Sequence, residues 1–141
     1  HHIPDMELSA FFDKTINVED NRLIYLKYFL FIKYKENIYV EVKSVTLGLG
    51  KGLGAFPDAV TTRGLKHLRE LLEMKKAGHR AALLFCVQHE GIQEVRPADE
   101  IDPAYGALLR EVQRKGVEVL AYRADIDAQE IRLSTQVPVL F

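Results

Sequence analysis

The order of apolar and charged residues in the first third of the chain predicts a β-hairpin. Residues 23–32 are aromatic and β-branched, as strands prefer. A polar turn at residues 35–37 follows, and residues 38–45 then alternate between two faces of a strand. The alternating residues are Val40, Glu41, Val42 and Lys43. The two valines therefore share one face and the two charged residues share the other. A short helix or turn is predicted within residues 4–20, which precede the hairpin.

A glycine-rich segment and a first helix–strand unit come next. Residues 48–54 contain four glycines, and this density predicts a loop because glycine loses much conformational entropy inside an element. A helix follows, with Thr61 or Thr62 as its N-cap and Gly78 at its end. Residues 80–88 are almost continuously apolar, which predicts a strand buried on both faces.

A second helix–strand unit repeats this order. Asp102 precedes a proline and is the predicted N-cap, Gly116 ends the helix, and residues 117–122 form the next strand. Short edge or tail elements are expected at residues 131–133 and 137–141. The predicted order is β-β-α-β-α-β, and such crossover units build a sheet with helices on its faces. The fold class is therefore α/β, with a mixed central β-sheet flanked by helices.

The amino-acid composition is that of a globular protein. The chain has 141 residues, of which 48% are hydrophobic and 28% charged, as in one ordinary globular domain. A single cysteine, Cys86, excludes an intramolecular disulfide and fits a reducing compartment. The apolar stretches are too short to span a membrane. We expect a cytoplasmic protein with no membrane partner, and no functional role for the paired histidines His1 and His2.

The distribution of charge matters more than its total of −1. Residues 60–80 carry six basic and two acidic side chains, a charge of +4, so the rest of the chain carries −5. Arg63, Lys66 and His67 are placed on the solvent side of the first helix. That side is either a solvated face with ion pairs or a phosphate-facing patch at a helix start, where the backbone favours anions. Lys51, in the glycine-rich segment, joins these residues as the expected nucleic-acid-binding set.

Glu41-Val42-Lys43 is the sharpest local motif. Residues two apart on a strand project from one face, so a carboxylate and an ammonium lie together. With a carboxylate from a neighbouring strand they would hold Mg²⁺ and position a water for attack on a phosphodiester. Glu41 is then a metal ligand, and Lys43 orients or deprotonates the water. The alternative is an ion pair of the kind that any amphipathic strand carries.

Four segments together resemble the sugar fermentation stimulation protein family. The segments are YVEVKSVTL at 39–47, FPDAVTTRG at 56–64, KHLREL at 66–71 and GVEVLAY at 116–122. The resemblance implies a DNA-binding protein that regulates sugar (maltose) metabolism genes in bacteria. It also implies an N-terminal OB-like domain joined to a restriction-endonuclease-like, PD-(D/E)xK nuclease-type domain. Residues 1–141 look like the second domain alone, with Glu41 and Lys43 in its motif.

One position departs from the family. The family has an Asp on the strand before the motif, and Ile24 stands there in this sequence. A site without that carboxylate should bind Mg²⁺ poorly. Asp20 or the adjacent Glu19 could substitute, and we take Asp20 as the expected ligand. The leading hypothesis is thus a nucleic-acid-binding protein, with DNA favoured over RNA. The alternatives are a Mg²⁺-dependent nuclease and an inert scaffold or dimerisation domain, and the oligomeric state is not predicted.

Overall fold

The computed structural model describes residues 16–17, 27–31, 37–126 and 130–141. The predicted helix or turn at residues 4–20 therefore lies outside the described residues except for a two-residue strand, and the predicted first hairpin strand is described only in its second half. The elements are β1 (Ile16–Asn17), β2 (Lys27–Phe31), β3 (Asn37–Val45), β4 (Leu47–Gly50), β5 (Leu53–Phe56), α2 (Thr62–Lys76), β6 (Arg80–Val87), β7 (Glu94–Pro97), α3 (Pro103–Arg114), β8 (Glu118–Ile126) and β9 (Glu130–Val137).

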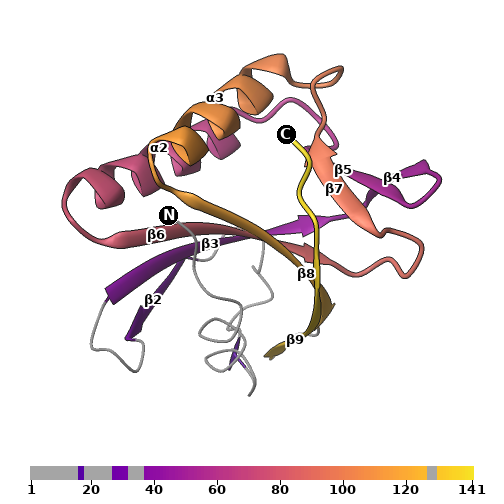
Figure 1. The fold of residues 1–141 in the computed structure, drawn as a ribbon, viewed down its shortest axis with the longest axis horizontal. Helices are drawn as coiled ribbons and strands as arrows, with labels where there is room; N and C mark the ends of the chain where they lie inside the picture. The colour runs from indigo at the N-terminus through magenta and orange to yellow at the C-terminus, as the bar shows by residue number, and fades with distance from the viewer. Residues whose placement is uncertain (1–15, 18–26, 32–36, 127–129) are drawn as a thin grey trace.

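A mixed sheet forms the centre of the molecule (Figure 1). Within the described ranges it has six strands, in the order β1-β9-β8-β6-β3-β2. Strands β3, β6 and β8 run parallel, whereas β2 is antiparallel to β3 and β9 is antiparallel to β8. The predicted α/β class and the predicted hairpin of β2 with β3 are both confirmed.

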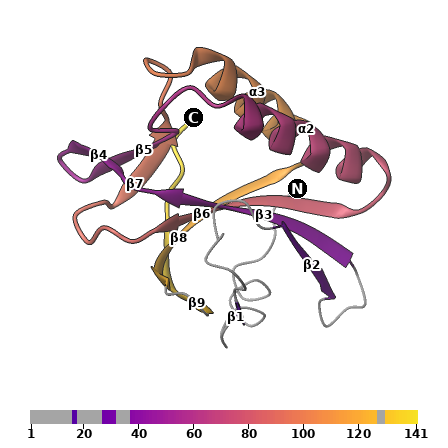
Figure 2. The ribbon, with the colours of Figure 1, turned by 180° about the vertical axis from the view of Figure 1, so that it is seen from behind.

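Helices α2 and α3 lie side by side over one face of this sheet (Figures 1 and 2). The core beneath them joins Leu68 and Leu72 of α2 to Leu109 of α3 and to Leu83 and Phe85 of β6. A buried Leu or Phe contributes about 1.5–3 kcal/mol, so this layer supplies much of the stability. Alternate residues fill the opposite face of the sheet and are buried as well, which confirms that β6 is covered on both sides. They include Val40, Val42, Ala82, Leu84, Cys86 and Tyr122.

Both helices begin and end where the local sequence predicts. Thr61 is the N-cap of α2, and its hydroxyl accepts a hydrogen bond from the Gly64 N–H at 2.9 Å. Gly78 follows the last turn with φ of 96°, a left-handed conformation that favours glycine. Asp102 caps α3 and accepts from the Tyr105 N–H at 3.0 Å. The start of α2 is thus fixed by its own cap.

The prediction of a loop at residues 48–54 is wrong, because these residues form most of a β-hairpin made of β4 and β5. Positive φ angles at Gly50, Lys51 and Gly52 close its turn in the sense that matches strand twist. At Gly54 a Cβ atom would lie 2.8 Å from a side-chain carbon of Ile92, so a close approach requires glycine there. The glycines therefore serve turn geometry and packing inside a hairpin.

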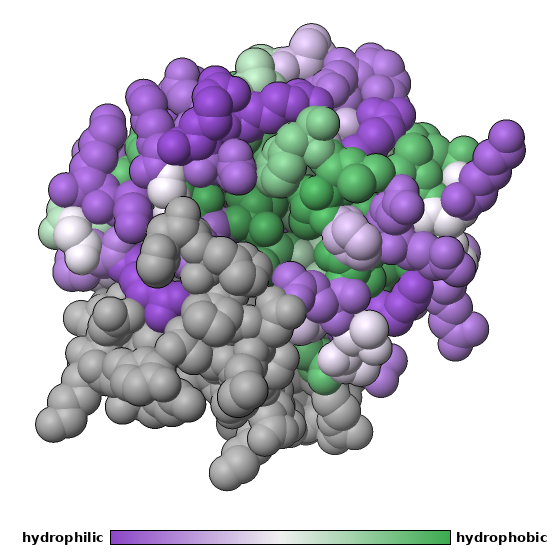
Figure 3. All heavy atoms as spheres, viewed as in Figure 1, coloured by the Kyte–Doolittle hydropathy of each residue, from purple (hydrophilic) through white to green (hydrophobic). Residues whose placement is uncertain are grey.

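A second, smaller sheet contains this hairpin and β7, a strand that the sequence did not predict. Among the described residues its order is β4-β5-β7. The C-terminal segment lies along β7, where Val95 N–H donates to the Pro138 carbonyl at 3.0 Å and Leu140 N–H to the Val95 carbonyl at 2.8 Å. Figure 3 shows apolar side chains gathered around this segment, which borders an apolar hollow of about 340 Å³. Leu140 and Phe141 are exposed beside it.

Candidate functional site

Strand β3 carries both predicted catalytic residues to the sheet face that lies under α2. The alternation of the strand directs Glu41 and Lys43 to this face, between β2 and β6. Their side chains are buried, with Glu41 0% and Lys43 4% exposed. Lys43 Nζ lies 3.7 Å from Glu41 Oε1. The E-x-K pattern therefore forms a buried ion pair.

His67 completes a three-residue cluster with this pair, contrary to the prediction that it lies on the solvent side of its helix. It is 7% exposed. Its Nδ1 lies 2.7 Å from Lys43 Nζ and 3.0 Å from Glu41 Oε1. The sheet-facing side of α2 is broad enough to include His67 next to Leu68 and Leu71, and a polar ring is accepted there because it meets charged partners. We call Glu41, Lys43 and His67 the buried cluster.

A cavity of about 260 Å³ adjoins the buried cluster at the start of α2. Lys43 reaches it from β3, and Thr61 and Arg63 reach it from the N-cap and first turn of α2. Asp58, from the segment that connects β5 to α2, also lines it. Its charged lining residues are thus two cations and one carboxylate, a net charge of +1. We call this the α2 cavity.

The remaining predicted nucleic-acid-binding residues are exposed and spread apart. Arg63 and Lys66 lie on the outer side of α2, and Lys66 borders a second cavity of about 340 Å³ that Glu41 and Arg69 also line. Lys51 is exposed at the turn of the β4–β5 hairpin and borders neither of these cavities. Figure 2 shows that this hairpin lies beyond the end at which α2 begins. Arg63 and Lys43 thus line the same cavity, whereas Lys51 does not.

The +4 charge of residues 60–80 is partly engaged within the fold. Arg80 Nη2 lies 3.6 Å from Glu118 Oε1, and both side chains are mostly buried. Burial raises the pKa of Glu118 to about 7, while Arg80 and then Lys75 act to lower it. Lys76 lies 3.8 Å from Glu73 on the exposed side of α2. The basic surface of α2 is therefore concentrated in its N-terminal half.

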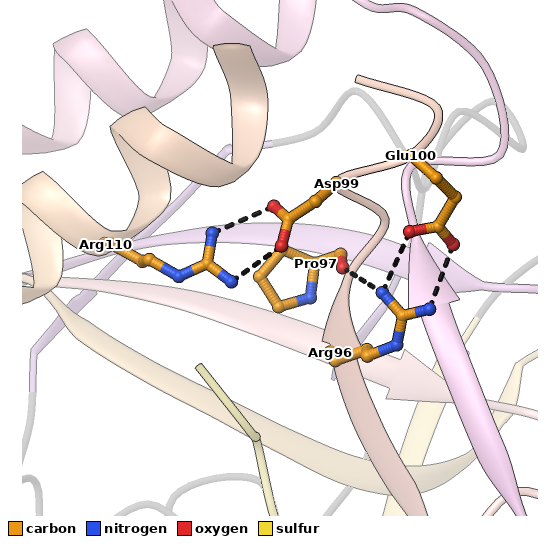
Figure 4. A network of polar contacts seen from close by, with 5 residues as sticks. All are labelled: Arg96, Pro97, Asp99, Glu100 and Arg110. Carbon is orange, nitrogen blue, oxygen red and sulfur yellow. Dashed lines mark hydrogen bonds and ion pairs between the residues drawn. The ribbon is translucent and has the colours of Figure 1, made fainter. Parts of the chain in front are cut away.

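A polar network fixes the segment next to the α2 cavity. Arg110 of α3 forms two hydrogen bonds to the Asp99 carboxylate, each of 2.8 Å, and Arg96 binds Glu100 in the same two-point way (Figure 4). Arg110 and Arg96 hold the pKa values of Asp99 and Glu100 below the ordinary range. This segment leads into Asp102, whose Oδ2 accepts from the Thr61 N–H at 2.9 Å.

Asp102 is a structural residue of the site that sequence reasoning did not identify. The sequence marks it as the cap of α3 but gives no signal that it also holds Thr61, 41 residues away. Tyr105, in the first turn of α3, packs against Gly64 in the first turn of α2. Burial, and then the negative charges of Glu41 and Asp102, raise the pKa of the Tyr105 hydroxyl. The start of α2 is therefore held by α3 as well as by its own cap.

The described residues do not supply a complete set of metal ligands. Within residues 16–17, 27–31, 37–126 and 130–141, no three His, Cys, Asp or Glu side chains are grouped to hold a metal ion. The predicted ligand Asp20, and Ile24 at the family's Asp position, lie outside the described residues. In the neighbouring strand β2, the residue paired with Glu41 is Lys27. Cys86 is buried and its pKa is raised to about 12, so it is a protonated thiol at neutral pH.

The family assignment comes from comparison with known proteins. A family profile described as "Sugar fermentation stimulation protein RE domain" matches residues 12–130. Proteins named sugar fermentation stimulation protein homolog are 60% identical in Saccharophagus degradans over 97 residues, and 61% identical in Shewanella halifaxensis over 105 residues. These matches cover 69% and 74% of this chain and 42% and 44% of the relatives. The chain thus spans less than half the length of these relatives.

A solved structure shows the same fold. It is titled "The structure of Pyrococcus Furiosus SfsA in complex with Ca2+", and the two chains superpose with a TM-score of 0.74 at 23% identity. The match covers 97% of this chain and 60% of the archaeal chain. No helix in the described part of the chain is long and apolar enough to span a bilayer. The chain belongs to the sugar fermentation stimulation protein (SfsA) family.

Proposed function

We propose that this chain binds DNA through the α2 cavity and the exposed basic residues beside it. The observation that carries the proposal is the meeting of Lys43, Arg63 and the N-cap Thr61 in one cavity with a positive lining. Cationic side chains and the N–H groups at a helix start are the usual protein partners of DNA phosphates. The first turn of α2 contains no acidic residue to oppose them.

The surface next to the cavity extends this basic region. Arg63, Lys66 and Arg69 are exposed along the N-terminal half of α2. Lys51 on the hairpin provides a further cation beyond the same end of the helix. The net charge of the chain is only −1, so we expect modest affinity that falls steeply with salt.

The family supports a finer assignment within this proposal. The E-x-K residues lie on an inner strand with an antiparallel neighbour on one side, a parallel strand on the other and α2 above. This arrangement agrees with a restriction-endonuclease-like, PD-(D/E)xK core. The "RE domain" description of the family supports the same assignment. We propose further that the complete protein acts as a cytoplasmic regulator of sugar (maltose) metabolism genes.

The second candidate function is a Mg²⁺-dependent nuclease. The Ca²⁺ complex named for the archaeal relative favours it, because a divalent cation in that protein is consistent with a carboxylate site in the family. The described residues of this chain do not fit such a site by themselves. Mg²⁺ requires several oxygen ligands, whereas Glu41 Oε1 faces two nitrogen atoms, of His67 and Lys43, at 3.0 and 3.7 Å. Glu41 and Asp20 are the ligands that this alternative would need.

The binding proposal is tested by fluorescence anisotropy with a labelled DNA duplex between about 50 and 200 mM salt. We expect salt-dependent binding by the wild-type chain and at least tenfold weaker binding by the variant R63E/K66E. The matched control is R114E/K115E, which also reverses two exposed basic residues, at the last position and the C-cap of α3, outside the lining of the α2 cavity. Equal losses in the two variants would mean that α2 is not the binding surface. Absence of salt-dependent binding by the wild type would defeat the proposal.

The nuclease alternative has its own test. Plasmid and short duplex DNA are incubated with the chain and Mg²⁺ or Mn²⁺, next to E41A and K43A. Cleavage that requires the metal and is lost in both variants would establish the alternative. DNA binding that persists in EDTA, without cleavage in the presence of metal, supports the binding proposal alone.

A further inference from the structure

Asp102 serves the starts of two helices at once. Its Oδ1 atom accepts a hydrogen bond from the Tyr105 N–H at 3.0 Å, which caps α3. Its Oδ2 atom accepts from the N–H of Thr61, the N-cap residue of α2, at 2.9 Å. Asp102 is 3% exposed, so both bonds are made inside the protein. One carboxylate therefore links α3 to the first turn of α2.

This link completes a capping box whose second half is missing from α2 itself. In a capping box, the N-cap hydroxyl accepts from the N–H of the third helical residue, and a Glu or Gln at that third position accepts from the N-cap N–H. The Thr61 hydroxyl makes the first bond, to the Gly64 N–H at 2.9 Å. Gly64 is the third helical residue and has no side chain to make the second bond. Asp102 makes it instead, from another helix.

Packing explains why α2 does not supply this carboxylate. A Cβ atom at Gly64 would lie 2.9 Å from Tyr105 Cε2 and 2.6 Å from Thr61 Cγ2, closer than carbon atoms approach. The ring of Tyr105 therefore occupies the place that a side chain at position 64 would need. Tyr105 stands three residues after Asp102, so the turn of α3 that excludes a Glu from α2 also delivers the replacement carboxylate.

The origin of this carboxylate matters for the charge at the α2 cavity. A capping-box Glu would place a negative charge in the first turn of α2, where it would take the place of a phosphate at the helix start. The first turn of α2 contains no acidic residue. Thr61 and Arg63 line the α2 cavity, whereas Asp102 does not. The N-cap is thus held by a carboxylate that lies outside the cavity lining.

We infer that Asp102 is a positioning residue for DNA, acting through Thr61 to hold the first turn of α2 and Arg63 at the α2 cavity. The inference rests on the proposed function for its ligand, a phosphate of the DNA backbone. Removal of the carboxylate leaves the Thr61 N–H unpaired, and the first turn opens to let water reach it. Arg63, two residues after Thr61, then loses its fixed place at the cavity wall.

Amide hydrogen exchange tests the bond without DNA. D102S keeps one oxygen that can cap α3, because serine is a favourable N-cap residue, but it lacks the second oxygen that binds Thr61. D102A lacks both. We expect the Thr61 amide to exchange at least about tenfold faster in both variants, since a hydrogen bond to a charged group is lost, and the Tyr105 amide to do so only in D102A. Wild-type exchange of Thr61 in D102S would overturn the inference.

The salt dependence of DNA affinity tests the positioning role. Each phosphate contact contributes about 0.9 to the slope of log affinity against log salt. R63M should remove one such contact from the wild type and weaken binding about fivefold to tenfold at roughly 100 mM salt. We expect D102S to show the same lowered slope, and R63M to change it little further in that background. A wild-type slope in D102S, or a full further loss from R63M, would mean that Asp102 only stabilises the fold and would overturn the role.

Two additional variants keep this test decisive. E111Q removes the same charge from α3, at a position that pairs with Lys115, and its slope should match the wild type; a slope as low as that of D102S would overturn the role. D102N, which also has a single acceptor oxygen, replaces D102S if circular dichroism shows that the serine variant is unfolded. If R63M changes neither affinity nor slope in the wild type, the proposed function fails and the positioning role with it, whereas the exchange of Thr61 still decides the bond.

Discussion

Lys43→Met should destabilise the fold in a way that depends on pH. The substitution keeps most of the apolar stem and removes the ammonium that lies 3.7 Å from a carboxylate with no solvent exposure. Removal of one partner of a buried ion pair costs about 3–5 kcal/mol when nothing replaces it. Here His67, 3.0 Å from the same oxygen, can take up a proton instead.

The cost of protonating His67 sets how much stability K43M loses. An ordinary histidine has a pKa of about 6.5, so protonation at about pH 8 costs roughly 2 kcal/mol, and at about pH 5.5 it costs little. We therefore expect K43M to lower the free energy of unfolding by about 2–4 kcal/mol at the higher pH and by less than about 1 kcal/mol at the lower one. The double variant E41Q/K43M, which also removes the carboxylate charge, should recover most of the loss.

Urea unfolding followed by far-ultraviolet circular dichroism measures these values, since the chain has no tryptophan. Lys115→Met is the matched control, because Lys115 Nζ also lies 3.7 Å from a glutamate, Glu111, but both side chains are about half exposed. That pair should contribute at most about 0.5–1 kcal/mol. Equal losses for K43M and K115M, or a loss for K43M that does not change with pH, would refute the account of the buried cluster.

Two further predictions concern residues that are not members of the buried cluster. The pKa of Glu118 is raised from 4.5 to about 7 by burial, so the folded state favours the protonated form. Wild-type stability should then fall by about 3 kcal/mol as pH rises from about 4.5 through 7, and E118Q should not show this loss; identical pH profiles in urea unfolding would contradict it. The Tyr105 hydroxyl is buried with no hydrogen-bond partner among the described residues, so Tyr105→Phe should leave stability unchanged or raise it by about 1 kcal/mol. A loss of more than 1 kcal/mol in the same assay would show a missing partner.

The parts of the fold that follow from local chemistry were predictable from the sequence. Thr61 and Asp102 cap their helices through side chains that accept a hydrogen bond from the backbone three residues ahead. The alternation in β3 placed Glu41 and Lys43 on one face, because a strand has a period of two whatever packs against it. These are short-range effects, and the sequence contains all their determinants.

Features that depend on distant contacts were not predictable. The burial of His67 depends on charged partners 24 residues away or more, and a helix drawn from its leucines alone places that ring in solvent. The glycines of the β4–β5 hairpin predict a loop, because the sequence does not show that Ile92 packs on Gly54. Strand β7 is four residues long and carries charged residues, so its own sequence does not predict a strand. It forms because it pairs with β5. Asp102 holding Thr61 is likewise a tertiary contact.

The location of the DNA on the chain is the central claim, and backbone amide spectra test it directly. A nitrogen-15-labelled chain is titrated with a short DNA duplex at low salt, and the chemical-shift change of every assigned amide is recorded. We predict that the largest changes fall at the α2 cavity, in Ser44 and in residues 61–63, with smaller changes along the N-terminal half of α2. Changes confined to the opposite side, in β9 and the C-terminal segment, or no changes at all, would contradict it.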